Sequence, residues 1–412
     1  MDQTIIKKIA SEYGTPSYVF DEKPLKARVL AIKEKTNGQF ELCYSIKANP
    51  FLIHVMAELT DKLEVCSPGE LNICKALNVR PETIVYSGVS KTKEDIKDAV
   101  SYGSGIFTAE SKRHLELLNE EGKISGKKLP VLLRLTSGNQ FGMSREDIFD
   151  IINNKDSYQS VSIEGIHYFA GTQRKKLQKQ KDELLMLKDF FDETEKNYSV
   201  RLKKLEYGPG LPVPYFSDED HSDTLAPFDE IMDDLIETSK WCELTVEMGR
   251  FFVSSCGYYI TKITDIKSSK DTNFVIVDGG INHVNYLGNM MGMKVPVVRH
   301  AKWTPGTGLV DHFATETDGL EQKWSTNPVP GVHTVCGSLC TTGDVLIRQL
   351  ELDAPSIGDI LVFENIGAYS VTEGIYLFLS RSMPCVIMLK EDGKIKLVRD
   401  HIETSNLNMG LE

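Results

Sequence analysis

The sequence predicts an α/β protein that consists of a closed (β/α)8 barrel and a second, all-β domain. Three observations lead to this fold class: short β-branched runs alternate with helical patterns, there are eight such runs, and the alternation stops after Arg250. Strands that alternate with helices form parallel βαβ units. Eight successive units close into a barrel. We expect the barrel over residues 25–250 and the β domain over residues 1–24 and 251–412.

The eight expected barrel strands are short and rich in branched and aromatic residues, which favour strands. They cover residues 41–47, 62–67, 83–88, 105–109, 130–135, 162–169, 203–208 and 243–249. Helical patterns separate them at residues 52–59, 69–77, 93–100, 110–118 and 176–197. In a barrel of this kind the helices form an outer ring, and the active site lies at the carboxyl ends of the strands.

After Arg250 the chain is a series of strand patterns joined by turns, without helices between them. We expect these strands at residues 251–267, 272–280, 358–370 and 385–398, and one more at residues 17–21. The segment 288–330 is long and turn-rich, and its sequence predicts no regular structure. Long ordered loops of this kind are often functional.

Composition limits the possible classes of function. The net charge of −12 leaves no surplus of Lys and Arg for nucleic-acid binding. No apolar run approaches the roughly 20 residues that cross a bilayer, and the first residues carry no export signal. The eight cysteines are scattered, without a Cys-X-X-Cys pair. We therefore expect reduced thiols, no metal site and a cytoplasmic protein.

The stretch CYSIKANP, residues 43–50, ends an apolar strand with a single lysine, Lys47. An amine at a strand end of a barrel is placed where such enzymes carry out their chemistry. Apolar walls would favour its neutral form, which can form a Schiff base. The alternative is a lysine that extends from the strand edge into water.

Two later strand ends carry groups that suit an anionic cofactor. Gly208 and Gly210 follow the seventh strand, and Gly249 and Arg250 follow the eighth. Glycines at these points would let backbone N–H groups approach a phosphate, although one such pair more often marks a tight turn. Glu247 could keep a pyridinium nitrogen protonated, or it could pair structurally with a neighbouring arginine.

Two turn-rich stretches of the second domain add reactive side chains. VCGSLCTTGDVL contains Cys340 beside Asp344, so the thiol could donate a proton, although a single cysteine is more often a small buried hydrophobe. The spacing of Cys336 and Cys340 is a poor metal signal without further ligands, and we expect no zinc. Tyr369 in GAYS could reach a phosphate oxygen or serve as a core aromatic residue.

Taken in order, the motifs YSIKANP, EVCSPGEL, GIHYFAGTQ, EYGPG, EMGR, VDGGINH, CGSLCTTGD and GAY resemble those of a known family. It is the pyridoxal-phosphate-dependent decarboxylases of fold type III, the alanine-racemase-like group that holds diaminopimelate, ornithine and arginine decarboxylases. The resemblance covers nearly the whole chain. It implies pyridoxal 5'-phosphate as the cofactor and decarboxylation of an amino acid or aminoacyl group as the reaction. It also implies a homodimer with shared active sites.

The resemblance implies a role for each residue that matches a family motif. Lys47 matches the Schiff-base lysine, and Glu247 matches the partner of the pyridine nitrogen. Cys340 matches the thiol that returns a proton to the α-carbon, with Asp344 as its acidic neighbour. In this family the loop around Cys340 completes the active site of the other subunit.

The remaining cofactor and substrate positions also have counterparts. The family's phosphate site is matched by Thr172, Gly208, Gly210, Gly249, Arg250 and Tyr369. Glu64 stands where the family usually has Asp, and Phe169 stands where it commonly has a His that stacks on the pyridine ring. The candidates for substrate contacts are Arg134, His167 and Thr341.

Two departures from the family bear on the substrate. Thr341 replaces a Glu that diaminopimelate decarboxylases use to read the distal amino group, and residues 284–291 lack their Arg-Pro. The features QFGM, FAGTQ, VPYFS and LCT resemble the glutamyl-carrier-protein decarboxylase of butirosin biosynthesis. They imply a natural-product enzyme that acts on an aminoacyl group, either free or tethered to a carrier protein. The alternatives are a diaminopimelate-type decarboxylase of free amino acids, an amino acid racemase and a non-catalytic regulator that binds pyridoxal phosphate.

Residues 174–181, RKKLQKQK, carry five basic side chains on an otherwise acidic chain. Our hypothesis is that this stretch docks an acidic carrier protein or another anionic substrate tail. The alternative is a solvated helix face without a partner.

Overall fold

The computed structural model of the chain describes residues 1–286, 292–303 and 330–410. The chain divides into two compact units: Lys26–Val213 with Ser222–Phe252, and Met1–Leu25 with Pro214–His221 and Val253–Glu412. The short segment Pro214–His221 lies within the range that we expected for the barrel, but it groups with the other unit. Most of the turn-rich segment 288–330 lies outside the described residues.

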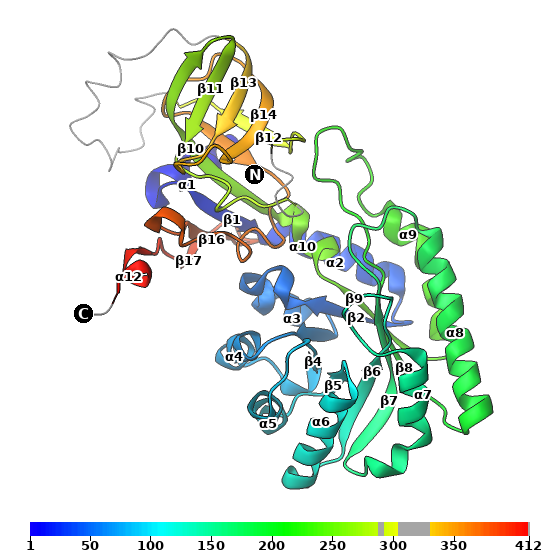
Figure 1. The fold of residues 1–412 in the computed structure, drawn as a ribbon. Helices are drawn as coiled ribbons and strands as arrows, with labels where there is room; N and C mark the ends of the chain where they lie inside the picture. The colour runs from blue at the N-terminus through cyan, green and yellow to red at the C-terminus, as the bar shows by residue number, and fades with distance from the viewer. Residues whose placement is uncertain (287–291, 304–329, 411–412) are drawn as a thin grey trace. The chain divides into compact units, whose positions relative to one another are not determined.

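The barrel unit contains eight parallel strands that close on themselves in chain order, so the predicted barrel is confirmed (Figure 1). The strands are β2 (Glu41–Ser45), β3 (Lys62–Val65), β4 (Ile84–Tyr86), β5 (Ile106–Ala109), β6 (Leu129–Arg134), β7 (Val161–Phe169), β8 (Lys204–Gly208) and β9 (Glu243–Met248). Closure comes from β2 and β9, which pair with Glu41 opposite Thr245.

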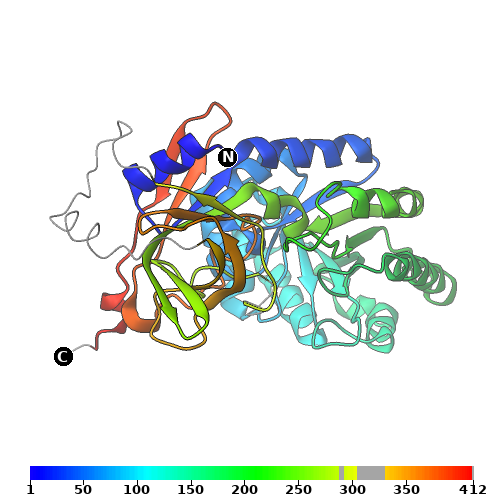
Figure 2. The ribbon, with the colours of Figure 1, turned by 90° about the horizontal axis from the view of Figure 1, so that it is seen from above.

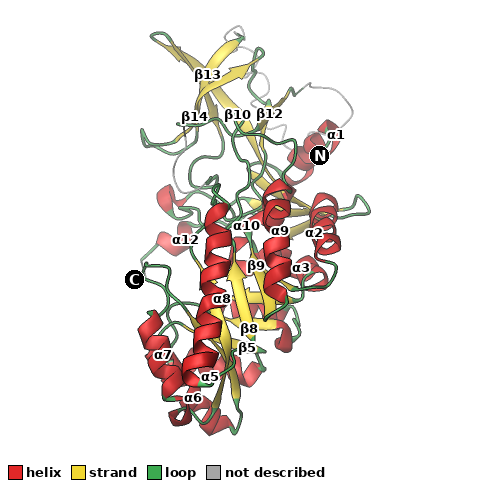
Figure 3. Cartoon of the chain, turned by 90° about the vertical axis from the view of Figure 1, so that its right-hand side faces the viewer, coloured by secondary structure: helices red, strands yellow, loops and turns green. Residues whose placement is uncertain are grey.

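Helices cover the outside of the barrel (Figure 3). They are α2 (Glu22–Thr36), α3 (Ile53–Leu59), α4 (Pro68–Ala76), α5 (Lys93–Tyr102), α6 (Lys112–Ser125), α7 (Arg145–Asn153), α8 (Gln178–Tyr198) and α9 (Ala226–Ser239). The short helix α10 (Arg250–Val253) directly follows β9. Ser67, Thr92 and Ser111 cap α4, α5 and α6, because each side chain accepts a hydrogen bond from a backbone N–H of the first turn. Among the described residues, no helix has both the length and the apolar character needed to span a membrane.

The second unit is built around a nine-stranded sheet with the order β14-β13-β11-β10-β1-β16-β17, in which β15 pairs with both β10 and β12. Its strands are β1 (Ser17–Asp21), β10 (Gly257–Ser269), β11 (Thr272–Val277), β12 (Val298–Ala301), β13 (Gly331–Cys336), β14 (Val345–Leu352), β15 (Ile360–Phe363), β16 (Cys385–Leu389) and β17 (Ile395–Arg399). The short helix α12 (Ser405–Asn408) follows the last strand.

The predicted strand at residues 17–21 is β1, which pairs with β10 and β16 although both lie more than 200 residues away in the sequence. Helix α1 (Gln3–Tyr13) precedes it and packs on the same sheet (Figure 2). Ile6 and Ile9 of α1 are buried in one apolar cluster with Val19 of β1 and Ile387 of β16. Burial of these side chains attaches the N-terminal segment to the C-terminal strands.

The sequence prediction was wrong at three places in this unit. Strand β12 lies in the segment 288–330, for which no regular structure was predicted. Residues 251–256, expected to begin a strand, are helical, and the strand starts only at Gly257. A Cβ on Gly257 would collide with the backbone of Gly367, so the two chain segments cross at close range there. The strands β13 and β14 were also missed, because the glycines between them dominate the local sequence pattern.

Candidate active site

Lys47 lies in a 3-10 turn, Ile46–Ala48, that directly follows β2. Its Nζ donates a hydrogen bond to Oε2 of Glu64 at 2.6 Å and lies 3.6 Å from Oε1 of Glu247. The expected apolar wall around this amine is therefore wrong. Two carboxylates face it from neighbouring strands, and opposite charges at this range favour the ammonium form.

Glu64, near the end of β3, is shared between two donors. Oε2 accepts from Lys47, and Oε1 accepts from the thiol of Cys66 at 3.1 Å. Burial raises the pKa of Cys66 well above its ordinary value, and the negative charge of Glu64 acts in the same direction. Cys66 is therefore a neutral donor that lies 3.6 Å from the Lys47 nitrogen.

Glu247 is the buried carboxylate of β9. Ser45 of β2 donates to its Oε1 at 2.7 Å, and Nε2 of His167 on β7 lies 3.0 Å from its Oε2. Burial acts to raise the pKa of Glu247, but the ammonium of Lys47 and the hydrogen bond with His167 outweigh it and hold the pKa well below the ordinary value. The carboxylate is therefore ionised at neutral pH, although water hardly reaches it.

His167 and Arg134 were expected to contact the substrate, and the structure pairs both of them with carboxylates instead. His167 is only 1% exposed and lies behind Glu247. Arg134, at the end of β6, forms a buried ion pair with Glu110 at 2.5 Å, and the ring of Phe141 lies 4.8 Å from its guanidinium carbon. The first side chain therefore supports Glu247, and the second holds the loop after β6 in place.

The loops after β7 and β8 are tied together by hydrogen bonds. The amide of Gln173 donates to the carbonyl of Val213 at 2.9 Å and accepts from the N–H of the same residue at 2.7 Å. Gly210 has φ +61°, and a Cβ at this position would collide with the carbonyl of Gly171. Only glycine fits this crossing. Thr172, between Gly171 and Gln173 in the loop after β7, is exposed.

Two other glycines bring strand ends close to neighbouring residues. A Cβ on Gly208 would overlap the ring of Phe169, which therefore lies directly against the end of β8. A Cβ on Gly249 would lie 2.9 Å from Cβ of Ala48, so the end of β9 runs against the turn that carries Lys47. Arg250 follows immediately as the first residue of α10. Glycines at strand ends lack a Cβ, so their backbone N–H groups can approach a phosphate closely.

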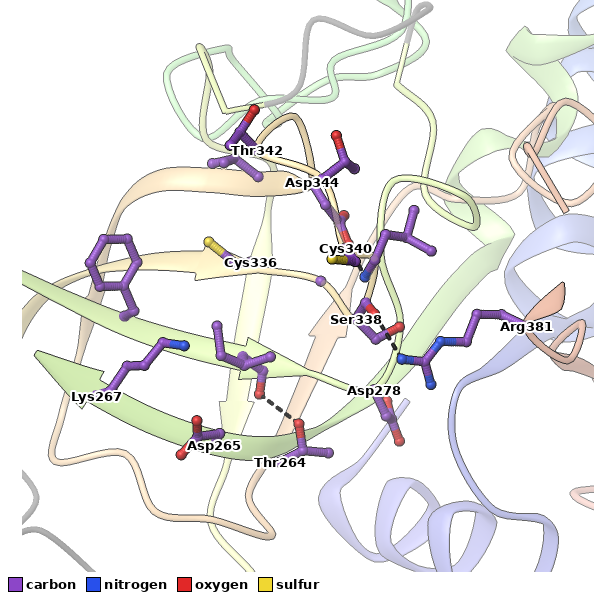
Figure 4. Close-up of a pocket in the computed structure, with 16 residues that line it drawn as sticks. Thr264, Asp265, Lys267, Asp278, Cys336, Ser338, Cys340, Thr342, Asp344 and Arg381 are labelled. Carbon is purple, nitrogen blue, oxygen red and sulfur yellow. Dashed lines mark hydrogen bonds between the residues drawn. The ribbon is translucent and has the colours of Figure 1, made fainter. Parts of the chain in front are cut away.

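In the sheet unit, Cys340 lies exposed on the loop between β13 and β14 (Figure 4). Asp344 holds this loop: its Oδ2 accepts from the N–H of Leu339 at 2.7 Å, and its Oδ1 accepts from the N–H of Ile281 at 2.9 Å. Burial raises the pKa of Asp344, and the two backbone donors oppose that effect. Thr341, next to Cys340, is also exposed.

The Cys340 loop borders a cavity of about 750 Å³ that also reaches β10 and β11. Arg381 lines the same cavity and donates to the carbonyl of Ser338 at 2.8 Å (Figure 4). Tyr369, elsewhere in the sheet unit, has φ +68° on a tight turn. A left-handed backbone at a residue of this size is strained, which is more common at functional positions.

The basic stretch 174–181 is partly neutralised in the structure. Both terminal nitrogens of Arg174 donate to the carboxylate of Glu183, and Lys181 lies 3.5 Å from Asp234. Arg174 and Lys181 are therefore held by carboxylates of the barrel unit, and neither side chain is fully exposed. The other three are exposed lysines at positions 175, 176 and 179.

Sequence reasoning missed three polar side chains of the barrel interior: Ser45, Cys66 and Glu206. Each lies two residues from a residue that was identified, namely Lys47, Glu64 and Gly208. Successive side chains of a strand point to opposite faces, so positions two apart share a face. This period of two could have found all three.

Residues 23–254 match the family model described as "Pyridoxal-dependent decarboxylase, pyridoxal binding domain". A diaminopimelate decarboxylase from Aquifex aeolicus is 26% identical, with 96% of this chain and 91% of that protein covered. The L-glutamyl–BtrI acyl-carrier-protein decarboxylase from Niallia circulans is 25% identical, with 97% and 94% covered.

Solved structures give the same result for the fold. Diaminopimelate decarboxylase from M. jannaschii, in complex with L-lysine, superposes with a TM-score of 0.80 at 25% sequence identity. The alignment covers 98% of this chain and 93% of that one. Both the barrel and the sheet unit of this chain therefore have counterparts in a solved structure.

Proposed function

This chain belongs to the pyridoxal-dependent decarboxylases, which take pyridoxal 5'-phosphate as their cofactor, and we propose that Lys47 holds the aldehyde of that cofactor at the carboxyl end of β2. The observation that carries this proposal is the position of the Lys47 amine, 2.6 Å from Glu64 and 3.6 Å from Glu247. A lysine at a strand mouth with two buried carboxylates beside it has a clear catalytic use and little value as a structural element.

The residues present fit this cofactor at each of its polar ends. Glu247 is buried and ionised, as a partner of a protonated ring nitrogen must be. Gly208, Gly210 and Gly249 follow or end the neighbouring strands β8 and β9, where residues without a Cβ would allow a phosphate to approach backbone N–H donors. Phe169 offers an aromatic face at the end of β7 for stacking on the ring.

When bound, the cofactor takes up the electron pair that the α-carbon keeps as carbon dioxide leaves. The residues of this chain would orient the cofactor and hold its protons for this loss of carbon dioxide. Glu247, oriented by Ser45 and His167, keeps a proton at the ring nitrogen. Phe169 would offer its ring for stacking on the bound cofactor, but it cannot donate the hydrogen bond that a histidine would supply there.

We assign to Cys340 the return of a proton to the α-carbon. Its thiol is exposed on a loop that Asp344 fixes through two backbone hydrogen bonds, so the loop presents the thiol at the surface of the sheet unit. We further propose that two copies of the chain form a homodimer in which each Cys340 loop completes the site of the partner subunit.

For the substrate, we propose an amino acid or aminoacyl group without a zwitterionic far end. Thr341 offers a hydroxyl beside Cys340, which can accept or donate a hydrogen bond but cannot pair with a distal ammonium. An aminoacyl group on a carrier protein meets this requirement, and the relative from Niallia circulans is named for such a substrate. Free diaminopimelate is the second candidate, because the relative from Aquifex aeolicus is named for it and covers the chain as fully.

The test is a screen for carbon dioxide release over L-amino acids, their D-epimers, meso-diaminopimelate and carrier-bound glutamate. We expect release from a subset of these compounds, and its absence in Lys47→Ala. Chiral analysis of the recovered amino acid in the same assays separates decarboxylation from racemisation. Inversion without carbon dioxide release would replace the proposal by a racemase, and binding without turnover would replace it by a regulator.

A further inference from the structure

Glu206 lies in the middle of β8 and is 2% exposed. It is opposite Thr245 in the register with β9 and opposite His167 in the register with β7. Interior positions of (β/α)8 barrels are dominated by bulky branched aliphatic side chains. A carboxyl group at such a position is therefore unusual, and no step assigned above uses it.

The neighbours of Glu206 make the interior rich in carboxyl groups. One polar atom from each of His167, Glu206 and Glu247 lies within 4.8 Å of the other two. Among the described residues, Lys47 is the cation of this region, and it already faces both Glu64 and Glu247. Oε1 of Glu206 is buried and has no hydrogen-bond partner among the described residues.

Titratable and charged groups face Glu206 from several elements. On the side of the site they are Cys43 on β2, Lys47 in the turn after β2, Glu64 on β3, His167 on β7 and Glu247 on β9. On the opposite side they are Glu41, Lys62, Glu164, Lys204 and Glu243. The lysines of the second group lie at the rim, where Lys204 pairs with Glu243 and Lys62 lies 3.9 Å from Glu41.

These surroundings determine the charge of Glu206. Burial raises its pKa well above the ordinary value, and the negative charges of Glu247 and Glu64 raise it further. The pKa of Glu247 is displaced in the opposite direction, because the Lys47 ammonium and His167 stabilise its anion against the effect of burial. Glu206 is thus neutral and Glu247 is ionised, although both lie in the same barrel interior. Carboxyl groups that have separate roles in one active site differ in charge in the same way.

A second cavity, of about 350 Å³, lies at the amino ends of the barrel strands and has Glu206 in its wall. It is lined by the rim residues of β2, β3 and β6 to β9, together with the apolar side chains of Val85, Ile106 and Leu132. Glu206 therefore separates this cavity from the His167–Glu247 pair. A proton on its carboxyl group can exchange with water from this end of the barrel without passing the substrate site.

We propose that Glu206 is a positioning residue whose carboxyl group carries a proton. The neutral group lies behind the His167–Glu247 pair, so it adds no further negative charge to the barrel interior. Its proton exchanges with water through the cavity at the amino ends of the strands. The proposal rests on the assignment of Glu247 to the ring nitrogen. Loss of the proton would add a charge next to Glu247, whose own affinity for a proton would then rise at the expense of the ring nitrogen.

The first test uses the apoenzyme, so it is independent of the assignment of Lys47. We expect the infrared spectrum of the parent at neutral pH to contain the C=O band of a protonated carboxylic acid that shifts in deuterium oxide and is missing from Glu206→Gln. Thermal unfolding gives a second readout. The folded parent keeps a proton that the unfolded chain gives up above its ordinary pKa, so Glu206→Gln should gain Tm relative to the parent as pH rises.

The second test uses the loaded enzyme and its pH profile. Glu206→Ala should lower kcat by roughly tenfold, as is typical of groups that act through another residue, and glutamine should restore most of that loss. Glu206→Gln should also keep its activity to higher pH than the parent, since it has no proton to lose. The control is Glu243→Gln, which removes an exposed carboxylate at the rim of the same cavity and should behave like the parent.

Two outcomes would overturn the proposal even in a fully active enzyme. One is an infrared spectrum of the parent without the carboxylic acid band. The other is a Tm of Glu206→Gln that falls relative to the parent as pH rises. Equal pH profiles for parent and Glu206→Gln would overturn the link to Glu247. The two proposals can fail separately. If Lys47 does not hold the cofactor but the infrared and Tm results are as expected, the proposed function is wrong, whereas Glu206 is still protonated.

Discussion

Nζ of Lys47 lies 2.6 Å from Oε2 of Glu64, so the amine that follows β2 is held by a carboxylate of the adjacent strand β3. Glu64 is 3% exposed, so this ion pair is largely shielded from water on the carboxylate side. The second oxygen of the same carboxylate accepts from the thiol of Cys66. Glu64 thereby holds the amine at the mouth of the barrel.

Lys47→Ala should abolish carbon dioxide release, because it removes the amine that faces both Glu64 and Glu247. Borohydride treatment of the loaded parent should attach the cofactor to the peptide that contains Lys47, and mass spectrometry should locate it. Lys62→Ala is the matched control, since it removes a lysine from β3 at the other end of the barrel. A label on another lysine, with Lys47 unmodified, would contradict the assignment.

Glu247→Gln should lower kcat by about a hundredfold or more, the loss seen when a preorganised electrostatic group is removed. Since the pKa of Glu247 is held below its unfolded value near 4.5, its stabilising contribution is present above that pH and disappears as pH falls through the folded-state value. The variant should therefore unfold at a lower Tm than the parent at neutral pH, and the two should converge in acid. A constant difference over the whole pH range would show that Glu247 is not ionised.

Cys340→Ala should slow product formation by roughly 10²- to 10⁴-fold, the range for loss of a general acid, or divert the reaction towards oxidative products. Cys336→Ala is the control, because Cys336 lines the same cavity from the end of β13 and has no assigned role. Product analysis by mass spectrometry after turnover in deuterium oxide measures proton return directly. If Cys340→Ala performs like the parent, the thiol is not the proton donor.

The carrier-docking hypothesis is tested on the three exposed lysines of residues 174–181, because an approaching protein can contact exposed charges directly. Replacement of residues 175, 176 and 179 by Gln should raise KM for a carrier-bound substrate and leave kcat for a free amino acid unchanged. The effect should shrink at high salt, as for other exposed charges. The matched control replaces three exposed lysines on another part of the barrel unit, at positions 97, 123 and 128. Equal KM values for both triple variants would end the hypothesis.

The sequence by itself determined the barrel, the sheet strands at residues 17–21 and 385–398, and the candidates Lys47 and Glu247. These depend on local features: the alternation of strand and helix patterns, and residue types at strand ends. Each strand boundary in the barrel lies within two residues of the predicted one, because turn residues and helix caps mark the limits of short strands.

Only the tertiary structure decided which side chains meet inside the barrel. Ser45 and His167 lie more than 75 residues from Glu247 in the sequence and still hydrogen-bond to it, because strand register and barrel closure bring their strands together. The same geometry turns Arg134 to Glu110 and places Glu206 behind the His167–Glu247 pair. Sequence spacing gives the face on which a side chain lies, whereas its partner across the barrel depends on the closure of all eight strands.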